Sequence, residues 1–155
     1  MAVYNTMTGN ALAGVVLGVR VDRATAALPQ TAAAAIFTVT GGRVAIMGIL
    51  GEVTTAIQNQ ANNTKLTANP TVGTSVDLCA VLSIANDEVG CLYGITGTVS
   101  DAMLGVNAGY APLPARPLVV NVGTIDLDCA ASNTGSVKWS IWYVQLDDGA
   151  VVTAA

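Results

Sequence analysis

The sequence predicts an all-β protein, an antiparallel β-sandwich or barrel with an extended N-terminal arm. Three observations lead to this class. Apolar and polar side chains alternate along several short stretches. Turn-forming residues separate these stretches at regular intervals, and no window of about 11–18 residues keeps the period of an amphipathic helix. A chain of 155 residues also fits a single domain.

The N-terminal part of the chain differs from the rest. Residues 1–30 are predicted to be an arm or loosely packed segment, and residues 31–155 to be a single β domain. Residues 1–14 are small and polar, with no sustained period. Residues 15–21 are expected to form one short strand. Pro29 then interrupts the chain, because proline has no N–H to donate to a sheet.

The central part begins with a stretch rich in β-forming side chains, residues 34–39. The Gly41-Gly42 pair that follows predicts a tight hairpin over residues 37–44, since glycine readily adopts positive φ. Residues 44–57 are then expected to form a long strand. The two glycines inside that strand predict bulges or bends.

The C-terminal part has the clearest alternation. Ile125, Leu127 and Cys129 share one face of a predicted strand, and Asp126 and Asp128 share the other. The apolar face is expected to be buried and the acidic face to be solvated. An acid/base pair or a divalent metal site at the two aspartates is the alternative.

A second alternating stretch follows after a turn, so the sequence predicts a β-hairpin over residues 123–148. Trp139 and Trp142 lie three positions apart and therefore point to opposite faces. Trp139 is expected in the core. Trp142 shares a face with polar residues, where an exposed aromatic ring suits an interface; a second hydrophobic layer is the alternative. Residues 150–155 are expected to be a short tail or edge strand.

The residue inventory argues against an enzyme. The chain has no histidine, which removes histidine-based nucleophilic catalysis and histidine zinc sites. The three cysteines, Cys79, Cys91 and Cys129, are too few for a four-thiolate zinc site. They are interpreted as small buried hydrophobes, with a Cys79–Cys91 or inter-subunit disulfide left open. No phosphate-binding glycine loop occurs, so no cofactor, metal or small-molecule substrate is expected.

Composition points to contacts with other protein molecules. Only 10% of the residues are charged and 52% are hydrophobic, so part of the surface is expected to be covered by neighbours; a weakly charged extracellular protein is the alternative. The six basic residues are scattered, which disfavours nucleic-acid binding. The longest apolar run, residues 11–19, is about half of the roughly 20 residues that a membrane span requires. Without signal-peptide features at the N-terminus, synthesis in a cytoplasm is expected.

Four side chains are the candidate interface residues. Trp142 and Lys138 lie on the polar face of the predicted C-terminal hairpin. Tyr110 and Arg116 lie in an irregular stretch, residues 100–116, which is expected to be a surface loop. Loops of this length in a compact domain are often functional.

Three segments together carry a resemblance to known proteins: "IFTVTGGRVAIMGILGEVTTAI", "KLTANPTVGTSVDLCAVL" and "GTIDLDCAASNTGSVKWSIWYVQLDDGAVV". Across roughly residues 33–152 the chain resembles small virion structural proteins of tailed bacteriophages. The resemblance implies a capsid decoration (cement) protein, made in the host cytoplasm, that is often trimeric. It would bind the outside of the capsid and bridge major capsid protein subunits. Another virion part, such as a tail or head-fibre subunit, is the alternative.

Overall fold

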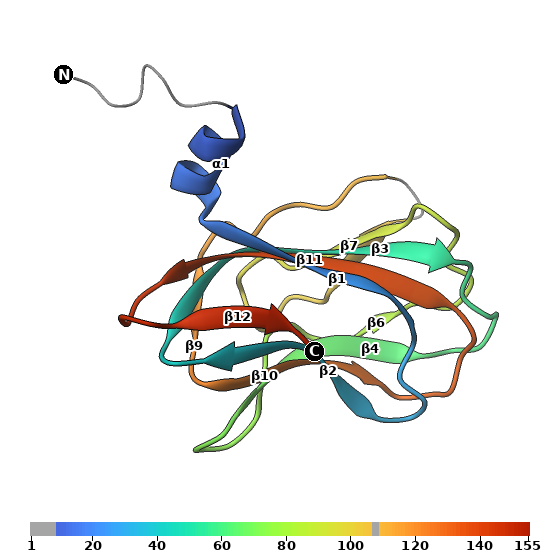
Figure 1. Cartoon of the computed structure of the whole chain (residues 1–155). Coiled ribbons are helices and arrows are strands. Elements are labelled where there is room, and N and C mark those ends of the chain that lie inside the picture. The colour runs from blue at the N-terminus through green and yellow to red at the C-terminus, as the bar shows by residue number, and fades with distance from the viewer. Residues whose placement is uncertain (1–8, 107–108) are drawn as a thin grey trace.

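The computed structural model of this chain describes residues 9–106 and 109–155 and is nearly all β (Figure 1). Two antiparallel sheets pack face to face and are not closed into a barrel. The predicted β-sandwich is therefore confirmed. One helix, α1 (Gly9–Leu17), precedes the strands in the described part of the chain and projects from the sandwich.

Each sheet has one central path of paired strands and one strand off that path. Sheet A runs β1 (Val19–Ala27), β11 (Ser136–Gln145), β3 (Val44–Thr55), β7 (Leu92–Gly94) and β8 (Leu104–Val106), and β9 (Leu118–Val120) also pairs with β3. Sheet B runs β12 (Val151–Ala154), β2 (Ala33–Thr40), β10 (Gly123–Cys129), β4 (Asn63–Pro70) and β5 (Val76–Asp77), and β6 (Leu82–Ser83) also pairs with β4.

The order of the strands is that of a jelly roll. Strands β1 to β4 alternate between the two sheets along the chain, and β10 and β11 each insert between two earlier strands. This gives β1-β11-β3-β7 facing β2-β10-β4-β5, with β12 added at the edge beside β2. Jelly rolls are double-sheet arrangements that occur in viral capsid and lectin domains and in cupins.

Both predicted hairpins are wrong, although the strands that flank them are present. The turn at Gly41 joins β2 in sheet B to β3 in sheet A, and the turn before Ser136 joins β10 in sheet B to β11 in sheet A. All four strands have an apolar face to bury. When the chain crosses from one sheet to the other, the apolar faces of the two successive strands pack against each other in the core. In a hairpin the two strands would lie in the same sheet, and their apolar faces would need other strands to cover them. Gly41 has a φ of 76°, which suits either kind of turn.

The crossing at Gly41 leaves no room for a side chain. A Cβ atom there would lie 2.2 Å from the main-chain oxygen of Gly149. Gly149 also has a positive φ, 82°, but a Cβ there would meet nothing within 4 Å. We therefore expect Gly41→Ala to lower the free energy of unfolding by about 1–3 kcal/mol more than Gly149→Ala, because only the first adds a steric clash to the backbone strain. Urea denaturation of the two variants measures the difference; equal losses would contradict it.

An ion pair ties two of the sheet-to-sheet connections together. The Arg43 main-chain N–H and Nε donate to Asp147 Oδ2 at 2.7 and 2.8 Å, and Nη2 donates to Oδ1 at 2.7 Å. Arg43 belongs to the β2–β3 connection and Asp147 to the β11–β12 connection. The Arg43 hydrogen bonds hold the pKa of Asp147 well below its usual range.

This ion pair predicts a pH-dependent effect of Asp147→Asn. A carboxyl group with a lowered folded-state pKa stabilises the fold above its unfolded pKa of about 4 and loses that effect as the pH falls further. The variant should therefore melt at a lower temperature than the unmodified chain near neutral pH, and the gap should narrow in strong acid. Thermal melts at about pH 7 and pH 2 test this. A gap that is the same at both values would contradict it.

The core lies between the sheets and is formed by the alternating faces that the sequence predicts. Ile125, Leu127 and Cys129 are at most 3% exposed. Trp139 is 2% exposed, and its ring stacks against Tyr93 with centroids 6.3 Å apart. The Trp139 prediction is thus confirmed.

The expectation that Asp126 lies on a solvated face is wrong. It does lie opposite Ile125 and Leu127, but it is only 6% exposed. Its strand is central in sheet B, where Ala35 and Thr67 flank it. One carboxylate oxygen accepts a long 3.4 Å bond from Asn69 Nδ2, and the other has no partner among the described residues. Asp126 points away from the core, but residues on the neighbouring strands β2 and β4 cover its side chain.

The glycines of β3 make room for the two tryptophans. A Cβ at Gly51 would lie 2.8 Å from the Trp139 ring, and one at Gly48 would lie 3.2 Å from the Trp142 ring. The register between β3 and β11 shifts beside Gly48, between Trp142 and Tyr143. The predicted bulge is confirmed at Gly48, and Gly51 instead provides space in a regular part of the pairing.

The strand predicted over residues 15–21 is wrong in position. The structure has α1 up to Leu17, and β1 begins at Val19. Gly18 ends the helix with a φ of 85° and donates its N–H to the Gly14 oxygen at 2.9 Å, as glycine commonly does. Strand β1 pairs with β11, so the projecting segment ends near Gly18 rather than at residue 30. Of the predicted arm, residues 9–17 are helical and residues 19–27 form β1, and residues 1–8 lie outside the described residues.

The stretch predicted to be a surface loop, residues 100–116, contains one short strand. Strand β8 pairs with β7 at the edge of sheet A. Residues 109–116 are irregular, as expected, and residues 107–108 lie outside the described residues.

Candidate interaction surface

Two of the predicted interface residues, Trp142 and Lys138, lie on the outer face of sheet A. Trp142 is half-buried, because the Arg20 guanidinium lies 5.3 Å from the centre of its ring and Gly48 packs beside it. Lys138 Nζ forms an ion pair with Glu52 at 2.9 Å. The outer face is therefore covered in part by the chain's own side chains.

The polar groups between these two residues are bonded to one another. The Ser140 hydroxyl donates to Asp22 Oδ1 at 2.6 Å, and Arg20 Nε donates to the same oxygen at 2.8 Å. The hydrogen bond from Ser140 lowers the pKa of Asp22 below its usual value, and the hydrogen bond and charge of Arg20 lower it further. This cluster leaves the middle of the outer face polar and ordered.

The other two predicted residues, Tyr110 and Arg116, lie on the irregular segment that crosses the outer face of sheet A. Within it, the Pro112 oxygen approaches Gly94, and Leu113 approaches Gly48. Tyr110 is 64% exposed, and Arg116 is exposed and forms no ion pair with the described residues. The structure thus places all four residues on the side of sheet A, two within the sheet and two on the segment that covers it.

The structure also reveals an apolar surface that sequence reasoning missed. Val144, Ala45 and Val119 lie side by side on three neighbouring strands, β11, β3 and β9. Val119 is 60% exposed and Val144 is 40% exposed. Val144 and Val119 face away from the core, because their chain neighbours Tyr143 and Val120 are buried. Ala45 lies between them and is 8% exposed, since the larger side chains on either side cover it.

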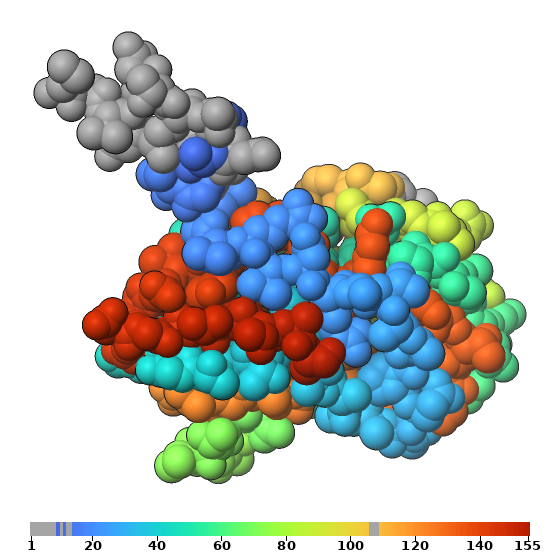
Figure 2. All heavy atoms as spheres, viewed as in Figure 1, coloured from blue at the N-terminus to red at the C-terminus, as the bar shows by residue number. Residues whose placement is uncertain are grey.

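A groove continues this surface between β9 and the β4–β5 connection. It has a volume of about 280 Å³ and is lined by Val72, Val76 and Val119. Val72 is 85% exposed and Val76 is 56% exposed. Figure 2 shows the β4–β5 connection projecting from the lower side of the molecule. A valine at the tip of such a projection leaves nearly all of its apolar surface in water.

Helix α1 extends the surface on the other side. Gly18, at the end of the helix, lies so close to Val144 that a Cβ would meet Val144 Cγ2 at 3.0 Å. Val15 is 54% exposed and Val16 is 63% exposed. The helix carries no charged residue, and it projects from the sandwich in Figures 1 and 2. We call the surface formed by the following residues the apolar strip: Val15, Val16, Val144, Ala45, Val119, Val76 and Val72.

The apolar strip has the composition of an interface and no catalytic chemistry. None of its side chains titrates, and the Arg43–Asp147 ion pair lies beside Val72 at its rim, around an open hollow of about 430 Å³. An apolar centre with a polar rim is typical of surfaces that bind other proteins. One sequence signal could have indicated it: Val72 stands between Pro70 and Gly73, where a turn normally carries polar residues.

The cysteines are buried and reduced. Cys79, Cys91 and Cys129 are at most 2% exposed and form no disulfide. Burial raises the pKa of all three thiols, that of Cys91 to about 11 with a further contribution from Asp87. Thiols in this state are unreactive, in agreement with the interpretation as small hydrophobes.

Neither a metal cluster nor a membrane span occurs in residues 9–106 and 109–155. No group of three or more acidic or cysteine side chains there could hold a metal ion. No helix in the same residues is long and apolar enough to cross a membrane.

No protein-family model, curated protein or solved structure matches this chain. The fold and the surface therefore define a class only: a β-sandwich with jelly-roll strand order and an exposed apolar strip at one end.

Proposed function

We propose that this chain is a structural protein of a bacteriophage virion that self-associates and decorates the outer surface of the capsid. The observation that carries the proposal is the apolar strip, which needs a partner surface to bury it. The jelly-roll strand order is one that viral capsid domains use, although a fold by itself does not define a function. The resemblance of three sequence segments to phage virion proteins supports the same role.

Other copies of the same chain are the proposed partner of the apolar strip. The strip carries no charge, so identical copies that meet through it do not repel one another. Helix α1 has nine residues, and an isolated helix shorter than about 12–15 residues is marginal in water. Packing of α1 against its counterparts in a trimer, or another closed oligomer, supplies the tertiary contacts that such a helix needs.

The segment with Tyr110 and Arg116, together with Lys138 and Trp142, is the proposed contact with the major capsid protein. Tyrosine and arginine are enriched at protein interfaces, where each combines apolar area with directional donors. Repetition of this contact over the shell multiplies weak single contacts through avidity. Bridged capsid subunits would then be held more firmly than unbridged ones.

Immunogold electron microscopy of particles from the phage that encodes the chain tests the proposal. An antibody against the purified protein should label the whole shell. A second test adds purified protein to shells that lack it, with Tyr110→Ala/Arg116→Ala expected to bind less and Val89→Ala, an exposed change elsewhere, expected to bind normally. Absence of label from the shell would contradict capsid decoration.

A tail or head-fibre subunit is the second candidate. Lectin domains also use the jelly-roll order, and the half-exposed Trp142 lies beside the hydrogen-bonded Arg20, Asp22 and Ser140, an arrangement of ring and polar groups that suits a sugar. Label confined to tails or fibres in the same microscopy, with binding to a glycan array that Trp142→Ala removes, would favour this role.

A further inference from the structure

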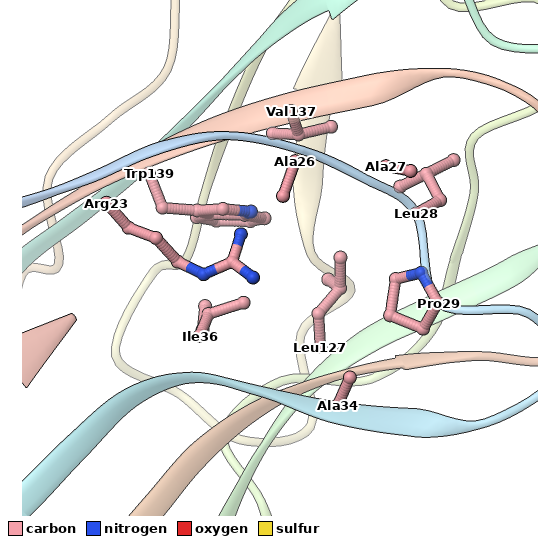
Figure 3. A pocket seen from close by; sticks show the side chains of 10 residues that line it. All are labelled: Arg23, Ala26, Ala27, Leu28, Pro29, Ala34, Ile36, Leu127, Val137 and Trp139. Carbon is pink, nitrogen blue, oxygen red and sulfur yellow. The ribbon is translucent and has the colours of Figure 1, made fainter. Parts of the chain in front are cut away.

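A small pocket opens between the two sheets near the side where β1 forms the edge of sheet A (Figure 3). It has a volume of about 70 Å³. Its lining comes from β1 and β11 above, from β2 and β10 below, and from Leu28 and Pro29 in the connection between β1 and β2. It is separate from the apolar strip and shares no residue with it.

Small side chains create the space. Ala26 on β1 and Ala34 on β2 face the pocket from opposite sheets, and Ile36, Leu127 and Trp139 form its walls. Nine of the ten lining residues are apolar. A cavity of this size admits water, but water held there would find very few hydrogen-bond partners. An apolar group that displaces such poorly held water binds favourably.

The exception among the lining residues is Arg23. It follows Val21 on the inward face of β1, and the register of β1 against β11 shifts between Arg23 and Ala26. In Figure 3 its guanidinium lies under the Trp139 ring at the pocket. A cation that faces inward beside an apolar pocket favours binding of a ligand with both an apolar part and a negative charge.

The guanidinium of Arg23 has N–H groups that make no hydrogen bond with the described residues. Its Nε donates to the main-chain oxygen of Ala155 at 3.1 Å, and its two Nη groups form no hydrogen bond or ion pair with the described residues. Four of the six basic residues, by contrast, form ion pairs with an Asp or Glu side chain: Arg20, Arg43, Lys65 and Lys138. The Nη groups of an arginine match the two oxygens of a carboxylate.

We propose that this pocket binds a small aliphatic group that carries a carboxylate. The aliphatic part lies between the sheets against Leu127 and Trp139, and the carboxylate accepts hydrogen bonds from Arg23 Nη. A free short-chain acid and the C-terminal leucine of a protein share this chemistry. The proposal is independent of the virion role.

Two-dimensional NMR titrations of the full chain test the proposal with 4-methylpentanoate and its neutral amide as probes. The acid should saturate below roughly 20 mM and shift the amide signals of Ala26 and Ala34, and the neutral amide should bind at least tenfold more weakly. A short peptide that ends in leucine, compared with 4-methylpentanoate, identifies the source, since the natural one should bind more tightly.

Three variants complete the test. Arg23→Gln should weaken binding of the acid at least tenfold. Ala34→Leu should abolish binding, because the larger side chain fills the pocket. Arg116 is the other arginine that forms no ion pair with an Asp or Glu side chain of the described residues, and Arg116→Gln should leave binding of the acid unchanged. Equal binding of the acid and its amide, no saturation, or full binding by Arg23→Gln would overturn the proposal. In those cases Arg23 serves only to keep the edge strand from pairing with other chains.

Discussion

Replacing Trp139 by alanine is expected to lower the free energy of unfolding by about 3–5 kcal/mol, the usual cost of removing a large buried aromatic ring. Trp139 is 2% exposed on a strand that lies between β1 and β3 in sheet A. Its ring stacks against Tyr93 and packs on Gly51, which has no side chain that could fill the void. A domain whose whole stability is about 5–15 kcal/mol would lose a large share of it.

Chemical denaturation followed by circular dichroism measures this loss. Trp142→Ala is the matched control, because it removes the same ring from the outer face of the same strand. Trp142 is half-buried and contacts Arg20 rather than the core, so its loss should be clearly smaller. Similar losses for the two variants would contradict the assignment of inner and outer faces.

Introducing charge into the apolar strip is expected to weaken self-association by about 100-fold or more. In Val72→Asp/Val119→Asp, each copy places two carboxylates in the proposed interface, and burying unpaired charge there is costly. Every symmetry-related contact in a closed oligomer carries the same change. The fold should be unaffected, because Val72 is 85% exposed and Val119 is 60% exposed, and exposed substitutions usually change stability by less than about 0.5 kcal/mol.

Sedimentation equilibrium measures the association constants, with Val89→Asp as a control that adds a single charge away from the strip and is compared with Val72→Asp and Val119→Asp taken singly. Val89 is 64% exposed, and its neighbours Asp87 and Gly90 bond to Ile57 and Val53 near the far end of β3. That end is opposite the strip, so Val89→Asp should associate like the original chain. Equal weakening by Val89→Asp and by the single strip variants would mean that net charge, rather than the strip, controls association.

Side-chain alternation predicted the strands and their buried faces well. Ile125 and Leu127 on β10, and Trp139 and Ile141 on β11, are buried as their spacing indicates. Alternation says nothing about which strands pair. A glycine turn at Gly41 can close a hairpin or carry the chain to the opposite sheet, and the choice depends on strands that arrive later in the chain.

The candidate surface was harder to predict, for the same physical reason. Val144 and Val119 are far apart in the sequence and become neighbours only through Ala45 on β3. Asp126 was expected in solvent and is buried because of residues on β2 and β4. Surfaces made of single residues from several strands leave no local pattern. The low charge of the whole chain predicts that some surface is covered, but composition cannot say which residues form that surface.

The native mass of the unmodified chain, measured by native mass spectrometry over about 1–100 micromolar, tests most directly whether copies of this chain bury the apolar strip. We predict a closed oligomer, most simply a trimer, whose population rises with concentration. A species with the mass of a single chain at every concentration would contradict it.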